Sequence, residues 1–185
     1  MRVIGGEFRS RLLETIPGGA TRPTSDRLRE TLFNILQSRI RGAMFVDAYA
    51  GIGAVGIEAL SRGAAHVYFL ESARPALQAI GRNLASLKLQ PRATVYPGKV
   101  LATLERCPPA IVFLDPPYDQ AEEYTAALEL LSRRQQALVI AQHSIRLKLE
   151  DAYGPLTRTR LLKQGDSALS FFAPQGKPDG ESVIL

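Results

Sequence analysis

Between residues 24 and 41, the apolar positions fall on one face of a helix. They are Leu28, Leu32, Ile35, Leu36 and Ile40. Spacings of three and four residues are typical of an amphipathic helix that buries one face. Pro23 precedes this segment, Thr24 or Ser25 can cap its first turn, and Asp26 favours the positive end of the helix dipole. The pattern therefore predicts a helix that begins near residue 25.

From residue 43 onward, short apolar runs alternate with helical stretches. The expected strands are 44–46, 67–70, 93–96, 111–114 and 137–141, and the expected helices are 54–61, 75–87 and 121–131. This alternation predicts an α/β fold with a mostly parallel sheet that helices cover on both faces. Two further runs, 156–162 and 168–172, flank Gly165-Asp166 and predict an antiparallel hairpin at the C-terminal end of the sheet.

The two ends of the chain differ from this pattern. Residues 1–13 predict a short β-hairpin that bends at Gly5-Gly6. Residues 174–185 combine proline, glycine and charge and predict a loosely held tail. We therefore expect an extension at 1–23, one α/β domain at 24–173 and a tail at 174–185. A length of 185 residues is enough to bury the core of one such domain.

The composition is that of an ordinary globular protein, with 45% hydrophobic and 22% charged residues. Cys107 is the single cysteine, so no intrachain disulfide can form and a reducing compartment is expected. With one cysteine and two histidines, no metal site is expected. No apolar run approaches the roughly 20 residues of a membrane span, and residues 1–11 lack the apolar core of a signal peptide. These features predict a cytoplasmic protein without a membrane partner.

The positive charge is concentrated at the N-terminal end. Residues 1–41 carry eight arginines and four acidic residues, so that about +4 of the net charge of +5 lies there. A basic end of this kind favours a polyanionic partner such as RNA or DNA. A solvated basic face is the alternative interpretation.

A glycine-rich turn follows the first apolar run of the domain. Gly51, Gly53 and Gly56 match the spacing G-x-G-x-x-G, and Glu71 lies 20 residues after Gly51. Glycines in this turn let a backbone approach a nucleotide closely, and a carboxylate after the next strand can accept hydrogen bonds from ribose hydroxyls. Together with the neighbouring Ala50 and Ser72, these residues predict a site for an adenosine-containing cofactor.

Asp47 discriminates between two such cofactors. It lies at the end of the strand, before the glycines, where a carboxylate would repel the pyrophosphate of a dinucleotide. The same carboxylate suits the ammonium and sulfonium groups of S-adenosylmethionine. The alternative is that Asp47 bonds the backbone amides of the turn itself. The turn therefore favours S-adenosylmethionine over NAD.

The most specific feature of the chain is Asp115-Pro116-Pro117-Tyr118, directly after an apolar run. Two prolines fix the backbone and remove two N–H donors, which leaves carbonyl groups, notably that of Pro116, as acceptors for a ligand. The carboxylate of Asp115 is a second acceptor, and Tyr118 can stack on a flat base. Two adjacent acceptors suit an exocyclic NH₂ group and stabilise the charge that develops when it attacks a methyl group. The motif predicts an amino-methyltransferase, against the alternative of a turn that caps the next helix.

At these residues the chain resembles the amino-methyltransferases with an (Asp/Asn)-Pro-Pro-(Tyr/Phe) motif, and more narrowly the RsmD-type bacterial 16S ribosomal RNA (guanine-N2)-methyltransferases. The resemblance covers residues 1–173. Besides the glycine turn and Asp115 to Tyr118, it rests on Met1-Arg2-Val3-Ile4-Gly5-Gly6, on Arg22-Pro23-Thr24, Asp26-Arg27 and Arg29-Glu30-Thr31-Leu32-Phe33-Asn34, and on Glu58-Ala59-Leu60-Ser61-Arg62-Gly63-Ala64. A departure is Lys99, which stands where relatives often have Asp or Asn.

The resemblance implies a Rossmann-like class I methyltransferase sheet that transfers a methyl group from S-adenosylmethionine to N2 of one guanine in the small ribosomal subunit. It implies that Asp47, Ala50, Gly51, Gly53, Glu71 and Ser72 hold the cofactor, and that Asp115, Pro116, Pro117 and Tyr118 hold the guanine. It also implies that Arg9, Arg11, Arg22, Arg27 and Arg29 contact RNA phosphates.

Three alternatives remain at this level. An NAD-dependent dehydrogenase accounts for the glycines and Glu71 but not for the Asp115 motif. A catalytically silent RNA-binding assembly factor could share the fold. The same chemistry could also act on adenine N6 of DNA or on a protein glutamine.

Overall fold

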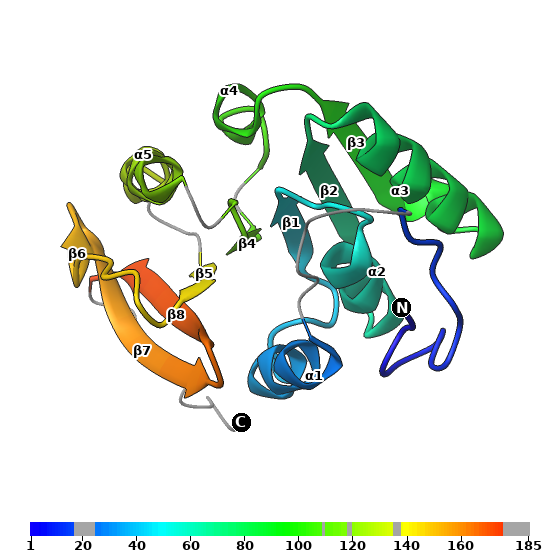
Figure 1. Cartoon of the computed structure of the whole chain (residues 1–185), viewed down its shortest axis with the longest axis horizontal. Helices are drawn as coiled ribbons and strands as arrows, with labels where there is room; N and C mark the ends of the chain where they lie inside the picture. Colours follow the sequence, from blue (N-terminus) through cyan, green and yellow to red (C-terminus); the bar gives the residue numbers. More distant parts are fainter. Residues whose placement is uncertain (17–24, 109, 118–119, 135–137, 176–185) are drawn as a thin grey trace.

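A computed structural model describes residues 1–16, 25–108, 110–117, 120–134 and 138–175. Its centre is one eight-stranded sheet with the order β3-β2-β1-β4-β5-β8-β7-β6 (Figure 1). The strands are β1 Met44–Ala48, β2 His66–Glu71, β3 Ala93–Pro97, β4 Ile111–Leu114, β5 Leu138–Ser144, β6 Ala152–Tyr153, β7 Leu156–Gln164 and β8 Ser167–Pro174. The helices are α1 Asp26–Ile35, α2 Ala54–Ser61, α3 Arg74–Ser86, α4 Val100–Leu104 and α5 Ala121–Ser132, with a short 3₁₀ helix at Gln90–Arg92.

The first five strands are parallel, and β1, β4 and most of β5 are buried, whereas the residues of β3 at the edge are partly exposed. β1 pairs with β2 on one side and with β4 on the other, and β4 pairs with β5. Side chains of α1, α2 and α3 pack into one core cluster and those of α4 and α5 into another, so that helices cover both faces of the sheet (Figure 1). β8 runs antiparallel to β5, and β7 antiparallel to β8, which closes the C-terminal end as a hairpin.

The strand order reverses at β1, since the chain passes first to β2 and β3 and later to β4 on the other side. In open α/β sheets, ligands bind beyond the carboxyl ends of the strands at such a point. The segments after β1, β2, β4 and β5 meet there. Asp47 and Glu71 lie at the carboxyl ends of β1 and β2, and Asp115 directly follows β4, so all three are at this edge.

The predicted fold class is confirmed, and so are most of its elements. Ser25 caps α1, its side chain accepting a hydrogen bond from Leu28 N at 3.2 Å. The helix ends at Ile35, earlier than the apolar pattern indicated. The predictions missed α4 and β6, which have five and two residues. Elements this short carry too few positions for a period to be recognised.

The N-terminal residues form a bent arm rather than a regular hairpin. In the described part of the arm, residues 1–16, the only bridge is the antiparallel one between Arg2 and Leu12. Val3 and Leu13 are buried, and Glu58 of α2 accepts hydrogen bonds from the backbone of Ile4 and Gly5. The arm is therefore fastened to the core of the domain.

At the C-terminal end, the predicted tail begins inside the sheet. Pro174 is the last residue of β8, and Gln175 donates a backbone hydrogen bond to Pro155 O at 2.8 Å. Regular pairing thus continues past residue 173. The remainder of the predicted tail, 176–185, lies outside the described residues.

Candidate cofactor and acceptor site

Asp47 is buried at the carboxyl end of β1, with 2% of its surface exposed. Its Oδ2 accepts a hydrogen bond from Gly56 N, in the first turn of α2, at 2.8 Å. The N-cap of α2 is Gly53, which has no side chain to cap the helix. Asp47 therefore caps α2 from the neighbouring strand, which agrees with the alternative interpretation that Asp47 bonds backbone amides of the turn. Its other carboxylate oxygen remains for a ligand.

Burial raises the pKa of Asp47 to about 8, although the hydrogen bond from Gly56 opposes this shift. The negative charges of Asp115 and Glu71 raise the pKa further. A carboxyl group at this edge of the sheet thus holds its proton near neutral pH in the free protein. A positively charged ligand beside it would favour its ionised form.

The glycines of the turn serve two different needs. Gly53 has a φ of +81°, a left-handed conformation that costs a side chain about 1–2 kcal/mol. Gly56 lies against β2, where a Cβ atom would come within 2.3 Å of Phe69 Cε1. Gly51 is different, because no atom lies within 4 Å of the place where its Cβ would be. The backbone at Gly51 therefore borders open space, as a close-lying cofactor requires.

Glu71 is the last residue of β2 and holds the same turn. Its Oε2 accepts from Gly51 N at 2.8 Å, and its Oε1 accepts from Ser72 N and Ala73 N at 2.8 Å each. A carboxylate has about four acceptor positions, so one remains for a hydroxyl group of a ligand. Ala50, also in the turn, donates to Leu70 O at 3.1 Å. The residues expected to hold a cofactor are therefore adjacent in space.

Asp115 and Pro116 follow β4, next to β1. Asp115 N donates to Ala48 O at 3.3 Å, and Gln142 Nε2 donates to Asp115 Oδ2 at 3.2 Å. The hydroxyl of Tyr124 lies 3.2 Å from Pro116 O. The single hydrogen of this hydroxyl is shared with the closer Gln142 O, at 2.8 Å, so the carbonyl group of Pro116 is only partly satisfied and keeps a lone pair for a ligand. Pro117 is exposed, and Tyr118 lies outside the described residues.

A tyrosine connects the cofactor turn to the helix after the acceptor loop. Tyr49 has a φ of 63°, which is rare for a residue with a side chain, and its hydroxyl donates to Glu123 Oε2 at 2.5 Å. Burial, followed by the bond to Glu123, raises the pKa of Tyr49 well above its usual value. Tyr49 therefore stays a neutral donor and links the turn to α5.

The arginines expected to contact RNA fall into three groups. Arg9, Arg11 and Arg27 are exposed. Arg22 lies outside the described residues. Arg29 is fully buried, and its Nη2 donates to Arg2 O at 2.6 Å and to Asp26 Oδ1 at 3.0 Å. The prediction that Arg29 contacts RNA is therefore wrong, because its guanidinium group holds the N-terminal arm instead.

Two side chains of types that often act in catalysis, His143 and Cys107, have structural environments. His143 is buried and bonds Ser170 Oγ at 2.8 Å and Ser144 O at 2.9 Å, and burial lowers its pKa. Burial raises the pKa of the Cys107 thiol to about 11, so that it is not a reactive thiolate. Neither provides a nucleophile.

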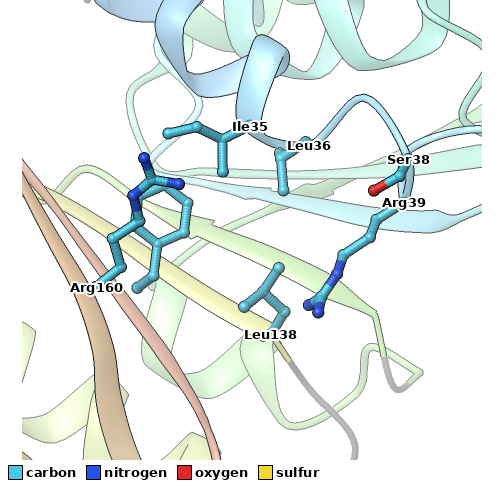
Figure 2. A pocket seen from close by; sticks show the side chains of 7 residues that line it. Ile35, Leu36, Ser38, Arg39, Leu138 and Arg160 are labelled. Atoms are coloured by element: carbon cyan, nitrogen blue, oxygen red, sulfur yellow. The ribbon is translucent and has the colours of Figure 1, made fainter. Parts of the chain in front are cut away.

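Two surface hollows lie outside this constellation. One of about 210 Å³ is lined by Ile35, Leu36, Ser38, Arg39, Leu138, Arg160 and Phe171. Figure 2 shows Arg39 and Arg160 on opposite sides of it, and Leu138 is the first residue of β5, so it opens at the amino edge of the sheet. The second, of about 410 Å³, lies between the N-terminal arm and the end of α3 and is lined partly by Arg9, Arg11 and Lys88. Sequence reasoning missed Lys88.

In the part of the chain that the structure describes, no helix has the length and hydropathy to cross a membrane. The same residues contain no group of three or more His, Cys, Asp or Glu side chains arranged to hold a metal ion.

Comparison with known proteins identifies the family of this chain. A sequence profile of the family described as "Conserved hypothetical protein 95" matches residues 1–173. YlbH of Bacillus subtilis, named as an rRNA methyltransferase, is 32% identical over 185 residues, which cover 95% of this chain and 100% of that protein. The chain belongs to this RsmD-type methyltransferase family.

Two relatives extend the comparison within the RsmD-type family. The Ribosomal RNA small subunit methyltransferase D of Escherichia coli is 43% identical over 120 residues, which span 64% of this chain and 60% of that protein. The solved structure of yhhF from E. coli, described as a methyltransferase, is 33% identical with a TM-score of 0.83, over 96% of this chain and 99% of that one. The resemblance to the RsmD-type family is confirmed, and the dehydrogenase alternative is wrong.

Proposed function

We propose that the protein transfers a methyl group from S-adenosylmethionine to the exocyclic N2 amine of a guanine in 16S ribosomal RNA of the small subunit. The observation that carries this proposal is the placement of two acidic sites on one face of the sheet. Asp47 pairs in register with Phe113, and Asp115 follows two residues later, so both side chains lie on the same face. The names of the relatives support RNA as the acceptor.

The residues of the turn fit the cofactor. Open space at Gly51 admits an adenosine, the remaining acceptor position of Glu71 suits a ribose hydroxyl, and Asp47 suits a cationic group. When bound, S-adenosylmethionine supplies an electrophilic methyl group. Ala50, in the turn, and Ser72, directly after β2, complete the proposed cofactor contacts.

The acceptor loop would activate and orient the amine. The lone pair of a guanine NH₂ group is delocalised into the ring, which makes the nitrogen a poor nucleophile. Asp115 and the second lone pair of Pro116 O would accept its two hydrogens, which favours the rehybridised amine and the charge that develops on it. We also assign base stacking to Tyr118, a contact worth about 1–3 kcal/mol. The base must leave its stack to reach this edge.

The exposed arginines of the N-terminal arm are the proposed RNA contacts, together with Arg27. Arg9 and Arg11 line one hollow with Lys88 and Glu7, and the three positive charges outweigh the single negative one where a phosphate backbone could lie. We expect Arg9→Gln with Arg11→Gln to weaken binding to small subunits and to make it less dependent on salt. The measurement is the affinity at several salt concentrations, where the slope should decrease by about two. An unchanged dependence of the affinity on salt would contradict a contact between these two arginines and RNA.

We expect the affinity for S-adenosylmethionine to rise with pH, because binding would ionise Asp47. The folded free protein holds this proton between pH 3.8, the ordinary pKa of an aspartate, and about pH 8. Its stability therefore falls, and its affinity for a cation rises, as the pH increases through that window. Calorimetric titration from about pH 6 to about pH 8 should give up to about a tenfold gain per pH unit. Asp47→Asn should remove this slope; a slope unchanged in that variant would assign the proton to another group.

The experiment that tests the function is product identification. Protein, methyl-labelled S-adenosylmethionine and unmodified small subunits are incubated, and the RNA is digested to nucleosides. Labelled N2-methylguanosine is the expected product. Label on another nucleoside would refute the guanine assignment, and label on DNA or protein alone would refute RNA as the acceptor. Cofactor binding and RNA binding without any transfer would favour the silent assembly factor.

A further inference from the structure

We propose that Gln142 and Tyr124 are positioning residues for the acceptor loop: they hold Asp115 and Pro116 in the geometry that methyl transfer needs. The inference rests on the proposed function, because it assumes that this loop receives the acceptor amine. Sequence reasoning missed both residues as part of the site.

Gln142 lies beside Asp115 at the carboxyl edge of the sheet. Ala141 pairs in register with Leu114, so the next residues of β5 and of the acceptor loop are neighbours on the same face. The Nε2 of Gln142 donates to Asp115 Oδ2 at 3.2 Å, and only 1% of the Gln142 surface is exposed. This bond favours the ionised carboxylate and restricts its rotation.

The other end of the Gln142 amide argues against a purely structural role. Among the described residues, its buried Oε1 has no hydrogen-bond partner. A buried acceptor without a partner costs folding free energy, and a hydrophobic side chain of similar size would avoid that cost. The residue is better explained by what its NH₂ group does for Asp115 than by a contribution to stability.

Tyr124 fixes the same loop from the opposite face. It lies in the first half of α5 and is fully buried. Its hydroxyl lies 2.8 Å from Gln142 O and 3.2 Å from Pro116 O, so its one hydrogen is shared between the end of β5, which has the shorter bond, and the acceptor loop. Prolines lack the N–H groups with which a loop usually fastens itself. The loop therefore depends on donors from outside, and Tyr124 and Gln142 provide them.

The test compares four variants of the full-length protein: Gln142→Leu, Gln142→Glu, Tyr124→Phe and, as a matched control, Tyr153→Phe. Tyr153 is also buried, and its hydroxyl accepts a hydrogen bond from Glu150 N at the far end of the sheet. Methyl transfer to small subunits gives kcat and the KM for each substrate. Thermal unfolding reports the stability of each variant.

We expect Gln142→Leu to lower kcat by about 10- to 100-fold, and Tyr124→Phe by about 3- to 10-fold, because small misplacements of reacting groups have effects of this size. The KM for S-adenosylmethionine should stay unchanged, since the bonds that these side chains make are to the acceptor loop and to the end of β5. Tyr153→Phe should keep the kcat of the natural protein even where its stability falls as much as that of Tyr124→Phe.

Gln142→Glu provides a signature that a structural role would not produce. At low pH, the introduced carboxyl group can donate its proton to Asp115 and partly replace the amide. As the pH rises, two adjacent carboxylates repel each other, so that kcat should fall over a range in which the natural protein shows no such fall. Low but pH-independent activity would refute the orientation of Asp115 by Gln142.

Other outcomes separate this inference from the proposed function. If Gln142→Leu and Tyr124→Phe keep the natural kcat, or change it only as Tyr153→Phe does, the inference is refuted and the function stands. If the natural protein methylates another RNA position, the guanine N2 assignment is refuted. The kcat of each variant relative to the natural protein, measured for that other position, then still decides the inference. Absence of any transfer to RNA by the natural protein would refute both. If Gln142→Leu fails to fold, Gln142→Glu and Tyr124→Phe give the decision.

Discussion

Asp115→Ala should lower kcat for methyl transfer by about 1,000-fold while cofactor binding is retained. Removal of one group that stabilises developing charge typically lowers kcat by about 100- to 1,000-fold. We expect the upper end of this range, because Asp115 also accepts the hydrogen bond from the Gln142 amide, which would lose its acceptor. The measurement is single-turnover transfer of labelled methyl to small subunits, together with calorimetric binding of S-adenosylmethionine. Asp47 and Glu71 stay in place in this variant, and loss of the Asp115 charge, which raises the pKa of Asp47, only makes Asp47 easier to ionise, so the cofactor should still bind.

Asp115→Asn separates the charge of the residue from its ability to accept a hydrogen bond. The amide oxygen can still accept from the amine, and the wider amino-methyltransferase motif permits Asn at this position. We therefore expect a loss of only about 10- to 100-fold. Asp151→Ala is the matched control, because Asp151 is exposed and pairs with Arg158 near the outer edge of the sheet. If Asp115→Ala retained most of its transfer rate, the acceptor site would have to be placed elsewhere.

The sequence was sufficient for the fold because buried parallel strands are nearly continuous apolar runs. The segment 111–114 is both the predicted run and the observed β4, and 54–61 is both the predicted and the observed α2. Asp47, Glu71 and Asp115 could be found for a related reason. Each follows an apolar run directly, and the carboxyl ends of parallel strands share one edge.

The remaining site residues gave no such signal. Gln142 and Tyr124 are 27 and eight residues from their partners Asp115 and Pro116, and no local spacing joins them. Arg29 was misjudged because a charged residue was assigned to the solvent. Its spacing to Leu32, Phe33 and Leu36 places it on the buried face of α1, and this spacing could have corrected the error. Glu58 is the only charged residue of the buried helix α2, and its apolar neighbours in the sequence could likewise have indicated that it is buried and needs a partner of opposite charge.

Glu58→Ala should lower the free energy of unfolding by about 3–5 kcal/mol, because it leaves the buried Arg29 with the half-exposed Asp26 as its carboxylate and removes the acceptor of two backbone N–H groups of the arm. Glu58 is fully buried and accepts from Ile4 N at 2.7 Å, from Gly5 N at 2.8 Å and from Arg62 Nε at 2.7 Å. Arg29, also fully buried, lies 3.9 Å from it. Burial lowers the pKa of Arg29, and Glu58 opposes that shift. Urea unfolding of both proteins gives the difference.

A double-mutant cycle identifies the charge as the cause. Arg29→Met alone should also destabilise, but Arg29→Met with Glu58→Gln should cost less than the sum of the two single variants, because the pair then leaves no uncompensated charge. Strict additivity would contradict an interaction between them. Glu129→Ala, an exposed glutamate on α5, should change the stability by no more than about 0.5 kcal/mol.

The variant Glu58→Gln also tests whether the buried pair supports the proposed RNA contacts. Glu58 holds the backbone of the arm at Ile4 and Gly5, and Ser61 of the same helix accepts from Phe8 N at 2.9 Å. Arg9 and Arg11 follow immediately along the arm. Glu58→Gln should therefore weaken RNA binding while the affinity for S-adenosylmethionine is preserved, because Asp47 and Glu71 lie on other elements. An equal loss of both affinities would instead indicate that the whole domain had loosened.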